Sequence, residues 1–368
     1  MKKPISPQWD PWDAWNTVQV KQRYELTSIE FTVTNLCNLR CEHCAVGETL
    51  LEKEMPFISL EKVFRRLDEV ETLQTISLTG GEPVFHPDTV EKAIKPILQY
   101  AKKRGIYTQL NTNLTLPYNR YEDWIEDVDV VHISYNYRDY QDFHRMVYAK
   151  MDRMVSTKIA ERTFTLMKDN AKKLADGGVF VSAETFLSPF TAPHILAMHE
   201  EVVAMGCQRH EVHPLYPSDF AKGMSLLSLE EYRQAVEDLI KEPKTWVLFG
   251  TLPFFPCSDD KRDQNLWVKL HQHPDITVRQ DPDGRNRLNI NLFTGNVTVT
   301  DFAELQSFGN ISNQKLVDIF HNWLQHPQAN RLHCMCPAAK CTGPNLLVAD
   351  SYYPAWEFKD RKSHVQVC

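Results

Sequence analysis

Six of the nine cysteines in this chain lie in two close groups, so thiol chemistry is the first function to consider. The first group, spaced C-x3-C-x2-C, consists of Cys37, Cys41 and Cys44. The second group, spaced C-x-C-x4-C, consists of Cys334, Cys336 and Cys341. The cysteine count is odd and the first residues contain no apolar segment suited to a signal peptide, so we do not expect a disulfide framework. Clustered cysteines in a reducing compartment indicate metal binding.

The first group can support more than one kind of metal site. Three thiolates from one loop can hold three corners of a [4Fe–4S] cube and leave the fourth iron open to a substrate or cofactor. Zinc is the alternative, with His43 as a fourth ligand, although structural zinc sites usually contain C-x2-C pairs. Three unrelated buried thiols are a third possibility.

The elements that position these cysteines follow a repeating pattern of strand, loop and amphipathic helix. The six predicted strands, rich in Val, Ile, Phe and Thr, cover residues 29–34, 74–78, 106–110, 128–134, 179–186 and 210–215. Ser228 and Glu231 predict a capping box at the start of one helix. Strands that alternate with helices indicate a parallel sheet, either doubly wound or a partial barrel, with ligands at the C-terminal strand ends.

The loop after the first predicted strand resembles a known signature. Residues 34–44, Thr-Asn-Leu-Cys-Asn-Leu-Arg-Cys-Glu-His-Cys, resemble the motif of the radical S-adenosylmethionine (radical SAM) enzymes. The second strand ends in Gly80, Gly81, Glu82 and Pro83, which match the GGEP motif of that family. Glycines allow close approach of the backbone to a ligand, and a carboxylate or carbonyl can accept from its ammonium group. The two motifs in this order favour an iron–sulfur cluster over zinc.

Two weaker matches follow in order. Asn113 lies where the family often has Thr-Asn-Gly-Thr, but Leu114 replaces the glycine, so we expect a less tightly turned loop. Ser134 lies where the family often has Ser-x-Asp, with Asn136 in place of the aspartate. The resemblance implies that Gly80, Gly81, Glu82, Pro83, Asn113 and Ser134 bind the cofactor. Capping of the strand ends by small polar residues is the alternative for the two weaker matches. Glu184 would face either the cofactor or a partner charge.

What the resemblance implies is an enzyme that cleaves S-adenosylmethionine reductively at a [4Fe–4S] cluster held by the first group. The resulting 5′-deoxyadenosyl radical would abstract hydrogen from an organic substrate, in an oxidoreductase or isomerase type of reaction. A peptide or protein is the expected substrate by analogy, and a cofactor or small metabolite is the alternative. A zinc-binding or redox-sensing protein without turnover is the alternative of another class.

The second cysteine group, with the glycine-containing turns before it, resembles the SPASM/Twitch extension of radical SAM enzymes. The C-x-C-x4-C spacing is most similar to the YfkAB-type radical SAM proteins. The usual Gly-x4-Cys is missing, since Thr300 follows Gly295 at that spacing. The resemblance implies one auxiliary [4Fe–4S] cluster, for which Cys368 is the first candidate fourth ligand, Cys257 the second, and an open or water-ligated iron the third possibility. A zinc site that includes His333 is the alternative.

We therefore expect a partial (β/α)6 TIM-like barrel followed by a small α+β domain. The expected parts are a Trp-rich extension over residues 1–27, the radical SAM core over 28–242, and the auxiliary-cluster domain over 243–368. Trp9, Trp12 and Trp15 are expected to pack across one barrel opening.

Composition limits the partners and the location. The formal net charge of −7 argues against a nucleic-acid-binding protein, and the short apolar runs argue against a membrane span. The expected partners are a reductant such as flavodoxin or ferredoxin and a peptide or small-molecule substrate, and the expected location is cytoplasmic.

Overall fold

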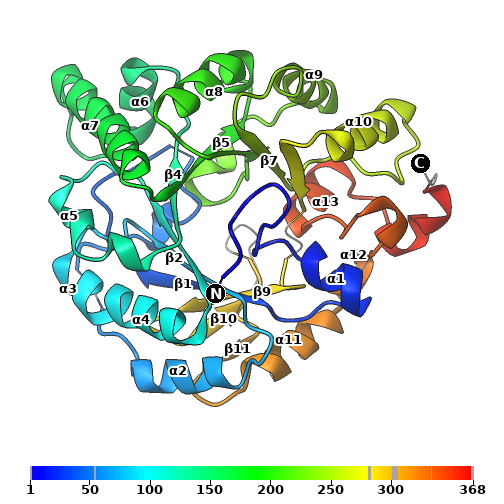
Figure 1. The fold of residues 1–368 in the computed structure, drawn as a ribbon, viewed down its shortest axis with the longest axis horizontal. Helices are drawn as coiled ribbons and strands as arrows, with labels where there is room; N and C mark the ends of the chain where they lie inside the picture. Colours follow the sequence, from blue (N-terminus) through cyan, green and yellow to red (C-terminus); the bar gives the residue numbers. More distant parts are fainter. Residues whose placement is uncertain (1, 54, 281–282, 301–305, 333, 366–368) are drawn as a thin grey trace.

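Parallel strands form the centre of the computed structural model, and helices surround them (Figure 1). The structure describes residues 2–53, 55–280, 283–300, 306–332 and 334–365. Eight strands follow one another side by side in chain order, each parallel to the next. They are β1 (Ser28–Thr34), β2 (Thr75–Gly80), β3 (Tyr107–Thr112), β4 (Val130–Ser134), β5 (Phe180–Leu187), β6 (Arg209–Pro214), β7 (Trp246–Gly250) and β8 (Ile276–Arg279).

Helices connect the strands and cover the outside of this partial barrel, as parallel pairing requires. The helices up to β8 are α1 (Trp15–Lys21), α2 (Leu60–Asp68), α3 (Pro87–Thr89), α4 (Lys95–Arg104), α5 (Asn119–Glu122), α6 (Tyr140–Val147), α7 (Thr157–Asp176), α8 (Ile195–Ala204), α9 (Leu229–Leu239) and α10 (Lys261–Gln272). The predicted capping box is present at the start of α9, where Ser228 N donates to Glu231 Oε2 over 2.8 Å. In the part of the chain that the structure describes, no helix has both the length and the apolarity needed to cross a membrane.

The six predicted strands correspond to β1–β6, but the parallel series continues beyond residue 242. Strands β7 and β8 were not among the six strands predicted from the sequence. All five residues of β7 are buried, so this short apolar segment packs inside the barrel wall. Two more parallel strands therefore lie in the region that we expected to form a separate small domain.

The C-terminal part extends the same sheet beyond β1. Strand β9 (Arg287–Asn291) pairs antiparallel with β10 (Asn296–Thr298), and β10 pairs antiparallel with β11 (Gly309–Asn310). Strand β9 also pairs parallel with β1. The remaining helices are α11 (Leu316–Leu324), α12 (Pro327–Leu332), α13 (Leu346–Tyr352) and the 3-10 helices η6 (Pro337–Ala339) and η7 (Phe358–His364).

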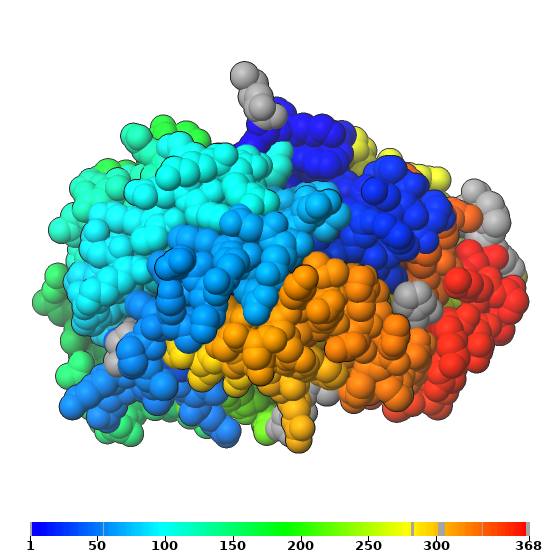
Figure 2. Space-filling model, turned by 90° about the horizontal axis from the view of Figure 1, so that it is seen from below, coloured from blue at the N-terminus to red at the C-terminus, as the bar shows by residue number. Residues whose placement is uncertain are grey.

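The N-terminal segment packs across the opening at the N-terminal strand ends, as predicted for Trp12. The Trp12 indole donates to Ser77 Oγ over 3.0 Å, and its ring meets that of Tyr107, the first residue of β3. Asp10 is buried there and pairs with Arg279 over 2.9 Å. Figure 2 shows this segment and α1 (dark blue) beside the orange C-terminal residues. The opposite ends of the strands are thus left for the functional site.

Candidate active site

The first cysteine group lies in the loop that follows β1. Cys37, Cys41 and Cys44 are half-buried free thiols. Backbone bonds fix the loop, since Arg40 N donates to Val147 O over 3.1 Å and Glu42 N to Met146 O over 2.8 Å. The loop is therefore held against the end of α6, and its shape does not depend on a disulfide.

The three thiols line a cavity of about 310 Å³ at the C-terminal strand ends. Gly80, Gly81, Asn113 and Ser134 line the same cavity, so the structure brings four of the predicted cofactor residues together with the cysteines. Among the described residues, no three His, Cys, Asp or Glu side chains are placed to hold a single metal ion. Thiol donors on the wall of a cavity of this size suit a polynuclear cluster with an open iron better than one ion.

Gly80 and Gly81 are required by the packing of β2 against the cysteine loop. Gly80 has a φ of +138°, and a Cβ there would lie 2.2 Å from Thr34 O. A Cβ on Gly81 would lie 2.1 Å from Leu36 O. We expected these glycines to admit a ligand, but the close approach that the structure shows is between two segments of its own backbone.

We predict that Gly81→Ala displaces the cysteine loop, because the new methyl group would collide with backbone and not with a flexible side chain. The unfolding free energy should fall by about 1–3 kcal/mol or more, and the iron bound after anaerobic reconstitution should decrease. Gly223→Ala is the matched control, since nothing lies within 4 Å of a Cβ there. Wild-type iron content and stability in Gly81→Ala would contradict this role.

Glu82 lies behind the cavity wall, and its side chain is fully buried. Its Oε1 accepts from Thr112 Oγ1 and its Oε2 from Asn113 N, both over 2.7 Å. Burial raises the pKa of Glu82 to about 7, although these hydrogen bonds oppose the shift. The carboxylate thus connects the GGEP turn to the end of β3, and Pro83 is buried beside it.

The turn after β3 is as tight as one with glycine would be, contrary to our expectation for Leu114. Leu114 adopts a left-handed backbone conformation with a φ of 54°. The fully buried side chain and a 3.0 Å hydrogen bond from Asn170 Nδ2 to Leu114 O stabilise this strained conformation. The turn leaves Asn113 Nδ2 3.0 Å from Asn38 Oδ1 and 3.9 Å from Cys37 Sγ.

The end of β4 approaches the cysteine loop through Asn136. Its Oδ1 accepts from Phe186 N over 2.9 Å, and its Nδ2 lies 3.4 Å from His43 Nε2. The His43 ring also packs against the Phe186 ring, with centroids 5.0 Å apart. Asn136 therefore connects β5 to the loop, while Ser134 keeps its place on the cavity wall.

Glu184 faces the cavity and pairs with two histidines. Its Oε2 lies 2.6 Å from His132 Nε2 and its Oε1 lies 2.5 Å from His213 Nε2. Burial alone would raise the pKa of Glu184, but the charge of His213 and hydrogen bonds from both imidazoles hold it well below its usual value. Burial would lower the pKa of His213, but the Glu184 carboxylate outweighs it and raises that pKa. A carboxylate shared by two imidazoles can hold or transfer a proton.

An ionic network lies deeper in the barrel. Arg279 Nη2 donates to Glu211 Oε1 over 2.5 Å, and both side chains line the cavity. Arg209 is fully buried and lies 3.6 Å from Asp10 and from Glu211. The cavity therefore ends on charged groups and not on an apolar floor.

Most of the residues that line the cavity inside the barrel were not predicted from the sequence. The unpredicted cavity residues include Glu30, Gln109, His132, Glu211, His213, Arg279 and Arg287. Several alternate with apolar residues along buried strands, for example at His132 and Ser134 on β4. Since side chains of a strand point alternately to its two faces, polar residues at every second position of an apolar strand would have indicated the interior.

The second cysteine group is buried away from this cavity. The exposed fractions of Cys334, Cys336 and Cys341 are 2%, 8% and 2%. The sulfurs of Cys334 and Cys336 lie 3.6 Å apart, and Cys336 pairs with Cys341 through two backbone hydrogen bonds of 2.9 and 3.1 Å. The structure thus gathers these three thiols, while Cys368 and His333 lie outside the described residues.

Two buried polar side chains fix the ends of this segment. Tyr24 OH lies 2.8 Å from Cys334 O and 2.6 Å from Thr342 O, so its single proton is shared between the two carbonyl groups. The Arg285 guanidinium, 1% exposed, donates to Leu332 O over 2.6 Å and also to Pro344 O. A buried cation beside a group of thiols favours negative charge there.

Comparison with known proteins agrees with the geometry. Residues 31–188 match the model of the radical SAM superfamily, and residues 215–363 match the YfkB-like domain. The chain belongs to the radical SAM superfamily and is a radical SAM enzyme. It is 46% identical over 364 residues to the "Putative protein YfkA" of Bacillus subtilis (strain 168), with 98% of each chain covered, and belongs to the same family.

Solved structures share the fold at low sequence identity. Streptococcus suis SuiB bound to precursor peptide SuiA has a TM-score of 0.60 at 13% identity, covering 93% of this chain and 76% of that one. Native anSMEcpe with bound AdoMet has a TM-score of 0.59 at 15% identity, covering 91% and 96%. A shorter sequence match, 35% identical over 101 residues, is to 7-carboxy-7-deazaguanine synthase of Methanopyrus kandleri, with 22% of this chain and 38% of that one covered.

Proposed function

We propose that this radical SAM enzyme abstracts hydrogen from a polar side chain of a peptide or protein held in the barrel cavity. The observation that carries the proposal is that one cavity contains the three loop thiols, the Gly80–Gly81 turn and the charged floor. Similarity of fold to SuiB and anSMEcpe, both solved with peptides, supports a peptide substrate.

Each part of the cavity has a separate role in this proposal. Cys37, Cys41 and Cys44 would hold the [4Fe–4S] cluster, which supplies the electron for cleavage of S-adenosylmethionine. The backbone at Gly80 and Gly81, with Asn113 and Ser134, would hold the methionine and ribose parts.

The histidines and Glu184 would orient the substrate. When His132 Nε2 donates to Glu184, its buried Nδ1, which has no hydrogen-bond partner among the described residues, keeps a lone pair for a substrate donor. His213 donates to the other oxygen of the same carboxylate. This arrangement selects a substrate with a polar group near the reacting carbon.

A second cluster would be held by Cys334, Cys336 and Cys341. Their common burial and the Arg285 cation nearby support an anionic cluster there. The small-metabolite alternative rests on a different observation, because the paired charges of Glu211 and Arg279 on the cavity floor also suit a compact polar molecule.

The test is an anaerobic assay of the reconstituted enzyme with S-adenosylmethionine and a reductant such as flavodoxin. We expect about eight iron atoms per chain, 5′-deoxyadenosine as a product, and deuterium in that product when a labelled peptide pool is supplied. Deuterium transfer from labelled metabolites but not from peptides would favour the alternative. A fully loaded enzyme that forms no 5′-deoxyadenosine would contradict both.

A further inference from the structure

Cys257 lies beside the second cysteine group, although it is far from it in sequence. It follows β7 and is 3% exposed, as deeply buried as Cys334 and Cys341. Cys257 belongs to the same buried cluster of side chains as Cys334, Cys336 and Cys341. Four buried thiols therefore share one region between the barrel and the C-terminal segment.

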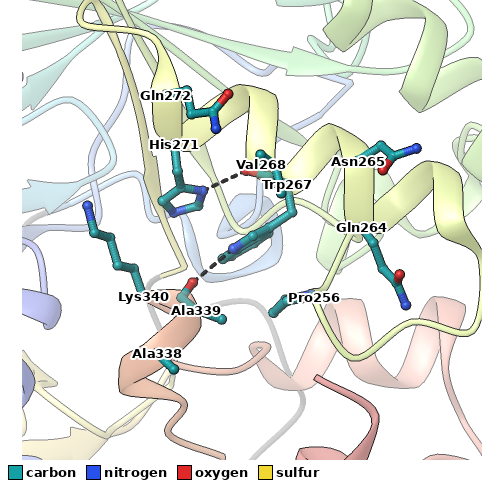
Figure 3. A pocket seen from close by; sticks show the side chains of 10 residues that line it. All are labelled: Pro256, Gln264, Asn265, Trp267, Val268, His271, Gln272, Ala338, Ala339 and Lys340. Carbon is teal, nitrogen blue, oxygen red and sulfur yellow. Dashed lines mark hydrogen bonds between the residues drawn. The ribbon is translucent and has the colours of Figure 1, made fainter. Parts of the chain in front are cut away.

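The loops that carry these thiols face each other. Pro256, next to Cys257, lines the same cavity of about 210 Å³ as Ala338, Ala339 and Lys340, which lie between Cys336 and Cys341 (Figure 3). Trp267 of α10 spans this contact, since its indole nitrogen donates to Ala339 O over 2.9 Å. The proximity of the two loops is thus built into the packing of α10.

The Cys257 loop is also held from the C-terminal side. Arg361 of η7 donates to Cys257 O from Nε over 3.2 Å and from Nη2 over 3.0 Å, and it pairs with Asp259 over 2.7 Å. Ser258 N donates to Phe255 O over 3.0 Å. These contacts engage the backbone of the loop, and the Arg361 guanidinium also lies close enough to the Cys257 thiol to favour its thiolate form.

We infer that Cys257 is the fourth protein ligand of the auxiliary iron–sulfur cluster, completing the set of Cys334, Cys336 and Cys341. This inference rests on the proposed function only in requiring that the second group binds a cluster. A cluster with four thiolate ligands has no open iron, so it serves electron transfer and not substrate binding. The Arg285 guanidinium lies next to Gly343, as does Cys334, and balances part of the negative charge of four thiolates.

Cys368 was the first candidate from the sequence for the fourth ligand of the auxiliary cluster. Cys368 lies outside the described residues, whereas Cys257 is in the described structure and belongs to the same buried cluster of side chains as the three thiols. An experiment can distinguish Cys257 from Cys368 as the fourth ligand. Only removal of the residue that binds the fourth iron should convert the [4Fe–4S] cluster to a [3Fe–4S] cluster.

The experiment uses full-length protein in which Cys37, Cys41 and Cys44 are all replaced by alanine, so that only the auxiliary site remains. After anaerobic reconstitution we expect about four iron atoms per chain in this background. Adding Cys257→Ala should lower the iron content to about three or fewer and give the EPR signal of an oxidised [3Fe–4S] cluster. Adding Cys207→Ala, another buried cysteine, should change neither. Cys257→Ser, a smaller perturbation of packing, should alter the Mössbauer spectrum of one iron site if Cys257→Ala fails to fold.

The possible outcomes distinguish the role of Cys257 as a ligand from the presence of the auxiliary cluster. Four iron atoms and an unchanged spectrum in the Cys257 variants would overturn the inference while leaving the auxiliary cluster in place. A [3Fe–4S] signal from Cys368→Ala, and not from Cys257→Ala, would also overturn the role of Cys257 while leaving the auxiliary cluster in place. No iron, or zinc alone, in the parent background would overturn the auxiliary cluster itself.

Discussion

Cys41→Ala is expected to abolish formation of 5′-deoxyadenosine from S-adenosylmethionine. Cys41 lies in the middle of the loop that lines the cavity with three thiols, and two thiolates cannot hold a cube at three corners. The iron content after reconstitution should fall from about eight to about four per chain, because the second cysteine group is separate and buried elsewhere. Anaerobic turnover followed by chromatography of the products measures the first effect, and iron determination measures the second.

Cys207→Ala is the matched control for this variant. Cys207 is also a buried cysteine, 4% exposed, but it lies just before β6 on the side of the barrel away from the cavity. It should retain both iron content and product formation. Formation of 5′-deoxyadenosine at the wild-type rate by Cys41→Ala would show that the loop is not the radical-generating site.

Glu184→Gln is expected to lower the unfolding free energy by about 2–4 kcal/mol near pH 6. The substitution keeps the shape of the side chain but removes the charge that faces two imidazoles at 2.6 and 2.5 Å. The His132 and His213 side chains are 6% and 12% exposed, so removing the half-buried carboxylate leaves two largely buried imidazoles without compensation. Urea unfolding under anaerobic conditions, at several pH values, measures the difference from wild type.

The pH dependence of this difference has a definite sign. The folded pKa of His213 is raised above its ordinary value of 6.5, so its contribution is complete below that value and is lost as the pH rises through the folded pKa. The folded pKa of Glu184 is lowered below its ordinary value of 4.5, so its contribution is complete above that value and is lost as the pH falls. The stabilising effect of the pair should therefore be largest between pH 4.5 and pH 6.5.

Glu237→Gln provides the control for a surface ion pair. Glu237 pairs with Lys269 over 3.2 Å, and both side chains are exposed. Its removal should change stability by less than about 1 kcal/mol, because solvent screens such pairs. A Glu184→Gln variant as stable as Glu237→Gln at pH 6, or a difference from wild type that grows as the pH rises above 6.5, would contradict the charged pair.

The two motifs whose residues lie close together in the sequence could be predicted from the sequence alone. The cysteine loop follows β1 and the GGEP turn follows β2, as expected, because the spacing within each motif is fixed by the covalent chain. The strands β1–β6 were predictable for a similar reason, since each is a local apolar segment bounded by loop residues. The tight turn at Leu114 was not, because the burial and the Asn170 hydrogen bond that stabilise it come from elsewhere in the fold.

The charged interior required the tertiary structure. Glu184, His132 and His213 come from three strands, and Arg279 comes from β8, a strand that was not predicted from the sequence. Their contacts depend on the register between parallel strands and on the curvature of the barrel. Neither quantity is encoded by spacing along the chain.

The sequence by itself thus determined that this protein has a loop of three thiols after the first strand of a barrel of parallel strands, and a second group of three thiols. Only the tertiary structure decided what surrounds them. Glu82 supports the GGEP turn from behind the cavity, and Cys257 reaches the second group because α10 and η7 hold its loop there. Short spacings are set by covalent geometry, whereas contacts between distant segments are set by packing, which no local pattern records.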